Sequence, residues 1–225
     1  MVVTEIFKSI QGEGTRAGLP CIFVRLTGCN LRCVWCDTTY AFHGGTKHGL
    51  GEVLARVHEL SGQGQRKTSL VEITGGEPLL QPETPELAQK LLAAGYTVMI
   101  ETSGGRFVGI LPREVIKIVD VKCPDSGEAD TFDLANLDVV DDKDELKFVI
   151  ASRRDYDFAR EFTERHQLAA RVRQVLFSPV FEDPEGRWLG LNPRELVAWI
   201  LADGLPVRLG LQLHKFVWDP ATKGV

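Results

Sequence analysis

Three cysteines, Cys29, Cys33 and Cys36, lie within eight residues of one another near the start of the chain. Their spacing, C-x3-C-x2-C, places three thiolates on one short loop. Three thiolates suit an iron–sulfur cubane whose fourth iron has no protein ligand. An iron without a protein ligand can bind and activate a small molecule. The spacing therefore indicates an enzyme, whereas four thiolates would indicate a simple electron carrier.

Clustered cysteines also bind structural zinc, and His43 and His48 lie close enough downstream to supply a fourth ligand. Zinc sites usually combine two short ligand spacings, and this chain has one. A disulfide framework is disfavoured, because the five cysteines are odd in number and a chain of 225 residues is too long to need cross-links. A cubane is favoured, and a non-catalytic zinc protein is the alternative.

A second segment with chemical potential, Gly75-Gly76-Glu77-Pro78, follows the apolar run 70–73. Two adjacent glycines let the backbone approach a ligand closely, and a carboxylate beside them can pair with an ammonium group. Taken alone, such a segment is usually just a turn. Trp35, immediately before Cys36, is either a core aromatic or a packing partner for a bound planar ring.

The composition is that of a globular protein, with 44% hydrophobic and 25% charged residues, and the length suits one α/β domain. The net charge of −5 argues against a nucleic-acid-binding surface. No apolar run approaches the length of a membrane span, and the first residues lack the features of an export signal. Because the thiols need a reducing compartment, we expect a cytoplasmic protein that binds neither nucleic acid nor membrane.

Apolar runs of strand length alternate with helical patterns, which predicts a largely parallel sheet. The expected strands are 2–7, 21–26, 70–73, 96–101, 115–121, 145–150, 172–177 and 207–213. The expected helices are 51–60, one from an N-cap at Thr84 to a stop at Gly95, 155–165, and one capped by Asn192 with Leu196, Val197, Ile200 and Leu201 facing the core. The acidic run 138–145 is expected to be a solvated turn, and Cys21 and Cys123 are expected to be buried thiols.

The loops that follow parallel strands meet at the carboxyl edge of the sheet, where chemistry gathers. The unusual residues of this chain lie in such loops, which are the cysteine loop and residues 74–78, 102–105, 120–124, 178–180 and 212–215. We therefore expect these segments to converge on one mouth.

The cysteine motif and the Gly-Gly-Glu-Pro turn together resemble the radical S-adenosylmethionine (SAM) superfamily. The resemblance implies a 4Fe-4S cluster on Cys29, Cys33 and Cys36, with the amino and carboxylate groups of SAM on the fourth iron. It implies one domain over residues 1–225 with an α/β fold, an abbreviated, modified (βα) partial TIM-like barrel of the radical SAM type. The cofactor contacts it implies are the backbone of Trp35, Cys36 and Asp37, and Gly76 and Glu77 at the methionyl end.

A narrower resemblance covers most of the chain. The segment Phe7-Lys8-Ser9-Ile10-Gln11-Gly12-Glu13-Gly14 is similar to the N-terminal signature of the 7-carboxy-7-deazaguanine synthase family, and supporting segments are 23–26, 36–38, 120–124, 145–149 and 211–215. The resemblance implies a lyase that converts 6-carboxy-5,6,7,8-tetrahydropterin to 7-carboxy-7-deazaguanine with loss of ammonia, toward queuosine and related deazapurines. It also implies Mg2+, a homodimer and an electron donor such as flavodoxin.

The same resemblance assigns roles to individual residues. It implies no catalytic side chain, because a 5′-deoxyadenosyl radical removes the substrate hydrogen. Substrate contacts are expected from Ile10, Gln11, Gly12, Arg25, Thr74, His214 and Lys215. Further cofactor contacts are expected from Ser103, Asp120, Val121, Lys122, Ser178, Pro179, Val180 and Phe181. Thr38, whose hydroxyl is a hard oxygen donor, is the expected Mg2+ ligand.

Several of these assignments have open alternatives. Arg25 offers a bidentate fork for the substrate carboxylate, but a structural salt bridge is the other possibility. Glu13 could cap a local turn, and Glu101 could either reach the mouth or be structural. A glycyl-radical activating enzyme shares the cluster chemistry but acts on a protein partner.

Overall fold

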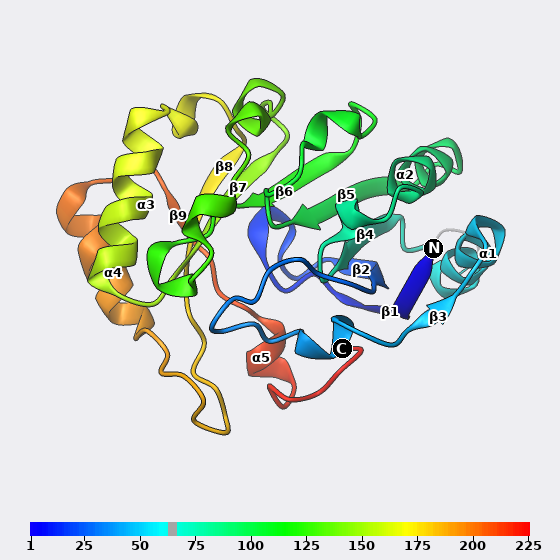
Figure 1. The fold of residues 1–225 in the computed structure, drawn as a ribbon, viewed down its shortest axis with the longest axis horizontal. Coiled ribbons are helices and arrows are strands. Elements are labelled where there is room, and N and C mark those ends of the chain that lie inside the picture. The colour runs from blue at the N-terminus through cyan, green and yellow to red at the C-terminus, as the bar shows by residue number, and fades with distance from the viewer. Residues whose placement is uncertain (63–66) are drawn as a thin grey trace.

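A computed structural model describes residues 1–62 and 67–225, and its strands form one curved sheet (Figure 1). Within these residues the sheet has nine strands in the order β3-β1-β2-β4-β5-β6-β7-β8-β9. β1 runs antiparallel to β2 and β3, and every neighbouring pair from β2 to β9 is parallel. The strands are β1 Val2–Ile10, β2 Pro20–Leu26, β3 Thr46–Lys47, β4 Leu70–Gly75, β5 Thr97–Thr102, β6 Ile116–Asp120, β7 Glu145–Ile150, β8 Gln174–Pro179 and β9 Arg208–Leu209. The predicted largely parallel sheet is confirmed.

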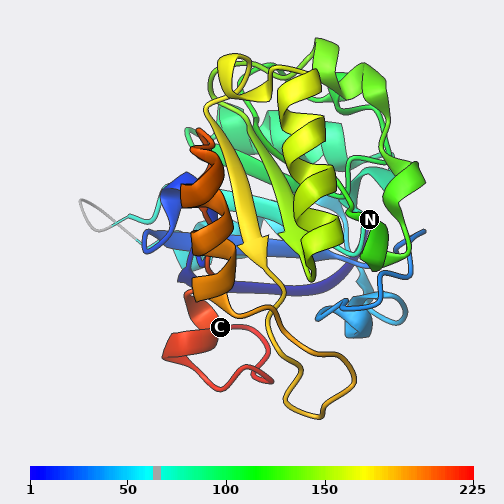
Figure 2. The same ribbon diagram turned by 90° about the vertical axis from the view of Figure 1, so that its left-hand side faces the viewer.

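Four of the described α-helices cover the convex side of the sheet, α1 and α2 toward one end and α3 and α4 toward the other (Figures 1 and 2). The helices are α1 Leu50–Ser61, α2 Thr84–Ala93, α3 Arg153–Arg165, α4 Pro193–Asp203 and the short α5 His214–Val217. α5 lies apart from the other four, near the cysteine loop (Figure 1). No helix among the described residues is both long enough and apolar enough to span a bilayer.

Alternation along the strands sends side chains to two different environments. Outward positions such as Val71, Ile100 and Phe148 join the large core beneath the helices. Inward positions toward the amino ends of the strands form a smaller apolar layer of Phe7, Cys21, Phe23, Leu70, Met99, Ile116 and Ile118, which we call the barrel floor. Above the floor, toward the carboxyl ends, the inward positions become polar: Arg25, Thr74, Glu101, Asp120 and Lys147.

The last predicted strand is wrong in its length. Instead of 207–213, only Arg208–Leu209 pairs with β8. Gly210 passes so close to β8 that a Cβ there would lie 2.4 Å from Ser178 Oγ. Beyond it the backbone leaves the sheet, since the Leu213 N–H donates to Gly12 O at 2.9 Å instead of extending the ladder.

Two predicted helix details are also wrong. Glu83 is the N-cap of α2, and Thr84 is its first residue, whose buried hydroxyl donates to Pro78 O at 2.7 Å. In α4, Leu196 and Ile200 face the core, but Leu201 is 74% exposed. Leu196 and Ile200 are four residues apart and share a face, whereas the residue after Ile200 lies about 100° further around the helix. The Asn192 cap is confirmed, because its side chain accepts from the Arg194 N–H.

The acidic run 138–145 is not wholly a solvated turn. Asp144 and Glu145 are almost completely buried. Asp144 forms an ion pair with Lys117 at 3.0 Å, and Glu145 accepts from the Thr15 N–H at 3.1 Å. Burial of an acidic side chain requires such partners, which lie far away in the sequence. The predicted burial of Cys21 and Cys123 is confirmed.

Candidate active site

The cysteine loop leaves the carboxyl end of β2 and packs against the glycine turn that follows β4. The Glu77 N–H donates to Gly28 O at 2.8 Å. A Cβ at Gly76 would lie 2.3 Å from Gly28 O and 2.7 Å from Cys29 Cβ, so only glycine allows this approach. The two motifs that the sequence singles out are therefore in direct contact.

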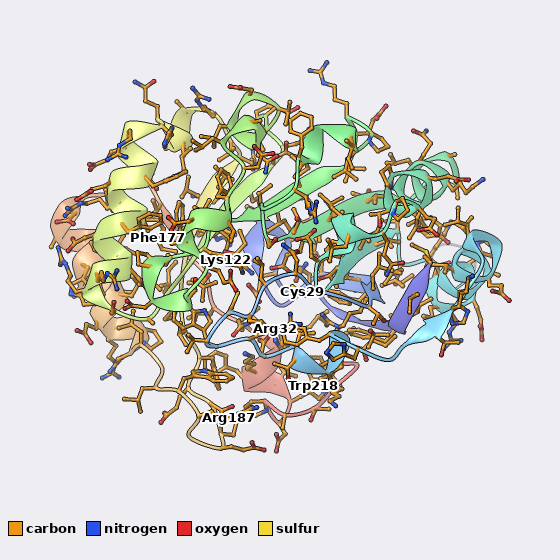
Figure 3. The ribbon with its side chains drawn as sticks, in the orientation of Figure 1. Cys29, Arg32, Lys122, Phe177, Arg187 and Trp218 are labelled. Carbon is orange, nitrogen blue, oxygen red and sulfur yellow. The ribbon has the colours of Figure 1, made fainter. Side chains whose placement is uncertain are left out.

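The other side of the cysteine loop contacts the segment after β6. The Val34 N–H donates to Ser126 O at 3.1 Å, and the Arg32 N–H donates to the Glu128 carboxylate at 2.6 Å. Figure 3 shows Lys122 reaching toward the loop that carries Cys29. The loop is thus held from both sides by the ends of β4 and β6.

The three motif cysteines have free, half-buried thiols. Burial raises the pKa of the Cys33 thiol to about 11, and the Lys122 ammonium opposes that rise. Among the described residues, no three His, Cys, Asp or Glu side chains converge as the ligands of one ion would. Each thiolate of a cubane binds a different iron, so a cubane does not need such convergence. Three free thiols on one loop, with the Gly76 turn against it, fit a 4Fe-4S cluster.

Glu77 connects the turn after β4 to the turn after β5. Its fully buried carboxylate accepts from the Leu79 N–H at 2.9 Å, the Thr102 hydroxyl at 2.9 Å, and the Ser103 N–H and hydroxyl at 2.8 and 2.6 Å. The Ser103 hydroxyl is therefore directed to Glu77. Contacts of Glu77 and Ser103 with SAM remain predictions, and their geometry here stabilises the turn that holds Gly76.

The end of β6 brings Asp120 and Lys122 to the same mouth. Lys122 Nζ lies 2.5 Å from Asp120 Oδ2, and although burial opposes the charge, Asp120 raises the pKa of Lys122. Asp120 Oδ1 is buried and has no hydrogen-bond partner among the described residues. A buried acceptor without a partner is unusual in a folded protein, so a ligand donor is expected there. Val121 between them is buried, and its N–H donates to Lys147 O at 2.8 Å.

Two carboxylates share one buried lysine above the barrel floor. Lys147 Nζ lies 3.0 Å from Glu13 and also pairs with Glu101. Although burial opposes the charge of Lys147, Glu101 and Glu13 raise its pKa well above the usual value. This contact places Glu13 and Glu101 at the mouth, the role that the sequence left open. Sequence reasoning missed Lys147, and the signal was a charged residue at an inward position of a buried strand.

Arg25 is held by a residue that the sequence did not single out. Its Nε donates to Glu5 at 2.7 Å, and the Tyr40 hydroxyl donates to the same carboxylate at 2.7 Å. The structural salt bridge is thus present. Among the described residues no hydrogen bond uses the terminal nitrogens of Arg25, so its fork stays available to a ligand. Thr74, which is buried, lies beside Arg25 in the register of β2 and β4.

The segment around α5 closes one side of the mouth. Gln212 Nε2 donates to Glu13 at 2.9 Å, and Lys215 Nζ lies 2.8 Å from Asp37. His214 packs so closely on Gly12 that a Cβ there would lie 2.2 Å from its Nδ1. Residues predicted near the substrate from opposite ends of the chain are therefore neighbours, as expected.

Asp37 connects this segment to the predicted Mg2+ ligand. The Thr38 hydroxyl donates to Asp37 Oδ1 at 2.9 Å. The surrounding protein opposes ionisation of Asp37, but the Lys215 ammonium lowers its pKa well below the usual range. Two hard oxygen donors thus lie next to Cys36.

The segment after β8 completes the mouth. Ser178, Pro179 and Val180 are buried, and the Phe181 ring contacts Phe216 edge-on with centroids 5.9 Å apart. A cavity of about 650 Å³ adjoins it, lined in part by Pro179, Val180, Phe181, Gln212 and Phe216. All the predicted loops therefore reach one region, although the cofactor contacts themselves remain predictions. Trp35 is half-buried in the cysteine loop, and Ile10 ends β1 opposite Pro20.

Comparison with known proteins connects this geometry to a family. The model of the radical SAM superfamily matches residues 23–165. A 7-carboxy-7-deazaguanine synthase from Koribacter versatilis is 53% identical over the full length of both chains. The chain belongs to this family. The synthase from Chlorobaculum tepidum is 40% identical, over 99% of this chain and 96% of its own length.

The fold agrees with that assignment. The crystal structure of QueE from Escherichia coli superposes with a TM-score of 0.72, at 24% identity, over 95% of this chain and 94% of that one. The predicted abbreviated radical SAM barrel is thereby confirmed. Family membership makes the chain a radical SAM lyase whose cofactors are a 4Fe-4S cluster and SAM.

Proposed function

We propose that residues 1–225 act as one domain that converts 6-carboxy-5,6,7,8-tetrahydropterin to 7-carboxy-7-deazaguanine with loss of ammonia. The main supporting observation is the polar layer above the barrel floor, directly beside the cysteine loop. There the terminal nitrogens of Arg25, which make no hydrogen bond among the described residues, suit a carboxylate, and the Gln11 amide with the Glu13 and Glu101 carboxyl groups suits the polar edge of a pterin. The name shared by the relatives supports the same product.

The cluster ligands in this proposal are Cys29, Cys33 and Cys36. When bound there, the cluster and SAM would supply the radical chemistry that removes a hydrogen from the pterin. The protein positions the reactants and excludes water. Gly76 gives the cofactor close access to the loop backbone, and Asp120 Oδ1, which has no partner in the described part of the chain, offers it an acceptor. The remaining cofactor contacts are Trp35, Cys36, Asp37, Glu77, Ser103, Val121, Lys122, Ser178, Pro179, Val180 and Phe181.

The substrate contacts in this proposal surround the floor. Arg25 binds the carboxylate, Thr74 and Gln11 bind the ring, and the backbone of Ile10 and Gly12 contributes further polar groups. His214, held over Gly12, covers the substrate. Lys215 forms an ion pair with Asp37, and it affects the substrate site mainly by holding Asp37 in place.

Mg2+ binds at Thr38 in this proposal, with the Asp37 carboxylate beside it as a second hard oxygen. The protein is a cytoplasmic homodimer and receives electrons from a carrier such as flavodoxin. Chelation of divalent cations is expected to lower turnover, and restored Mg2+ is expected to recover it.

The test is anaerobic reconstitution followed by an assay of the carboxypterin with SAM, reductant and Mg2+. Wild-type protein is expected to bind about four irons and to release the deazaguanine product. Cys33→Ala is expected to lose both, whereas Cys123→Ala, which removes a buried thiol outside the motif, keeps both. An intact cluster without product would overturn the substrate assignment. Stoichiometric zinc in anaerobic preparations would overturn the assignment of the protein as a radical SAM enzyme.

A further inference from the structure

Glu72 is a buried acid for which neither the family motifs nor the proposed chemistry has a use. It is 2% exposed and points inward from β4, opposite Phe23 of β2 and Met99 of β5 in the strand register. Phe23 and Met99 belong to the barrel floor. Glu72 is therefore a polar side chain at the level of the floor, beneath Thr74 and Arg25.

The partner of Glu72 is Gln11, one of the residues predicted to contact the substrate. Gln11 Nε2 donates to Glu72 Oε2, and Gln11 Oε1 accepts from the Glu13 N–H at 3.1 Å. A backbone N–H can only donate, so the atom facing Glu13 must be the carboxamide oxygen. The amide group then necessarily faces Glu72. Both ends of the carboxamide are thus held in one orientation, and Gln11 as a whole is 5% exposed.

We propose that Glu72 is a positioning residue that orients the Gln11 carboxamide toward the polar ring edge of the substrate. A free glutamine side chain can rotate by half a turn and exchange its donor and acceptor. The contact with Glu72 and the contact with Glu13 leave Gln11 one N–H and one oxygen lone pair in defined directions. This inference rests on the proposed pterin substrate and adds a residue that determines how the ring is recognised.

The charges around Glu72 favour its neutral form. Lys147 is already shared by Glu13 and Glu101, and among the described residues no cationic side chain donates a hydrogen bond to Glu72. Burial raises the pKa of Glu72 well above its usual value, and repulsion from Glu101 and Glu13 adds to the rise. The ionisable groups that face it are Glu13, Cys21, Arg25, Glu101 and Lys147. A neutral carboxyl still accepts from Gln11, so glutamine at this position would do the same.

The test compares Glu72→Gln and Glu72→Leu in the cluster-loaded enzyme, with Met99→Leu as a control at the same level of the barrel. Glu72→Leu is expected to raise the KM and the dissociation constant of the carboxypterin by about tenfold to a hundredfold, because Gln11 loses a buried partner. Glu72→Gln is expected to stay within about threefold of wild type. Cleavage of SAM without substrate is expected to be unchanged in both variants. Glu72→Met replaces Glu72→Leu if the latter does not fold.

Action through Gln11 is tested by a double-mutant cycle. In the Gln11→Ala background, Glu72→Leu is expected to add little further loss of pterin affinity. Additive losses, or an equal loss in Glu72→Gln and Glu72→Leu, would show a general structural role and overturn the inference. If wild type binds the carboxypterin and Glu72→Leu binds it equally well, this inference alone fails. If wild type does not bind it, the proposed function fails first.

Discussion

Two buried lysines on neighbouring strands, Lys117 of β6 and Lys147 of β7, are used in opposite ways. Lys117 faces the outer core, and its one ion-pair partner among the described residues is Asp144, at 3.0 Å. Lys147 faces the barrel interior and is shared by Glu13 and Glu101, with the uncompensated Glu72 nearby. The first is a closed pair, and the second is a cluster with more acids than bases.

The two environments shift the lysines in opposite directions. Burial lowers the pKa of Lys117, although Asp144 opposes that effect. Burial also acts against the charge of Lys147, but Glu101 and Glu13 outweigh it and raise its pKa. In a structural ion pair, the two opposite charges compensate each other. A ligand site also contains charged and hydrogen-bonding groups whose partners are supplied by the ligand. We therefore expect Lys117 to contribute to the stability of the fold and Lys147 to contribute to substrate binding.

The largest expected effect is that of Lys147→Met. It leaves Glu13 and Glu101 close together without their shared cation, at the position where the pterin is proposed to bind. We expect kcat/KM to fall by about 100-fold, equivalent to about 3 kcal/mol. Steady-state assays of the cluster-loaded variant measure this, and activity within a few fold of wild type would remove Lys147 from the site.

Lys117→Met tests the complementary expectation that Lys117 contributes to stability and not to turnover. Removal of one partner of a buried pair leaves Asp144 uncompensated, and the free energy of unfolding is expected to drop by about 3 kcal/mol. Turnover per folded molecule is expected to remain as in wild type, since Lys117 lies outside the barrel mouth. Denaturant titration and active-site-normalised kinetics measure the two quantities. Adding Asp144→Asn to Lys117→Met should recover most of the lost free energy of unfolding. Asn carries no charge, and its side-chain oxygen still accepts from the backbone N–H of residue 117.

The pH dependence of stability in Glu72→Gln tests whether Glu72 is neutral in the acidic cluster around Lys147. Because the pKa of Glu72 is raised in the folded state, its protonated form favours folding fully below the unfolded pKa of about 4.3, and this contribution is lost as pH rises through the folded pKa. Glutamine does not titrate. The free energy of unfolding of wild type minus that of the variant should therefore decrease with rising pH in chemical denaturation series. A difference that stays constant from about pH 5 to 9 would contradict a neutral Glu72.

The smallest effect is expected at the ion pair of Lys215 and Asp37. Asp37 is 45% exposed, so Lys215→Met should change the free energy of unfolding by less than about 1 kcal/mol. The pKa of Asp37 is lowered, so the pair acts above the unfolded pKa of about 3.9 and is lost as pH falls through the folded value. Limited proteolysis should cut the α5 segment faster in the variant. An unchanged rate of cleavage would mean that the hydrogen bonds of Gln212 and Leu213 are sufficient to hold the α5 segment.

Local signals in the sequence predicted most of the fold. Apolar runs of strand length located every long strand, and the Asn192 cap located the start of α4. The errors came where packing overrides local pattern. Residues 207–213 alternate like a strand, but after Gly210 the backbone bonds to Gly12. The helix pattern led us to predict Leu201 on the buried side of α4, but it is exposed.

Most of the predicted site residues lie at the carboxyl ends of strands or in the loops that follow them, and the sequence analysis missed Glu72 and Lys147 in the middle of strands. Cys29, Gly76 and Asp120 stand out because their types and positions are unusual for a turn. Glu72 is the one charged residue of β4, and Lys147 lies two residues after Glu145 in β7; neither residue by itself indicates its partner. Lys147 and Glu13 are 134 positions apart, and Lys147 and Glu101 are 46 apart.

By itself, the sequence determined the spacing of the three thiols, the glycine turn and the succession of strands and helices. These depend on neighbouring residues and on backbone sterics, which act over a few positions. Only the tertiary structure decided that Arg25 is held by Glu5, that Gln11 is held by Glu72, and that α5 closes the mouth beside Cys36. The partner of a charged or amide group is whichever group the fold brings within hydrogen-bond distance, and that depends on how the whole sheet curves.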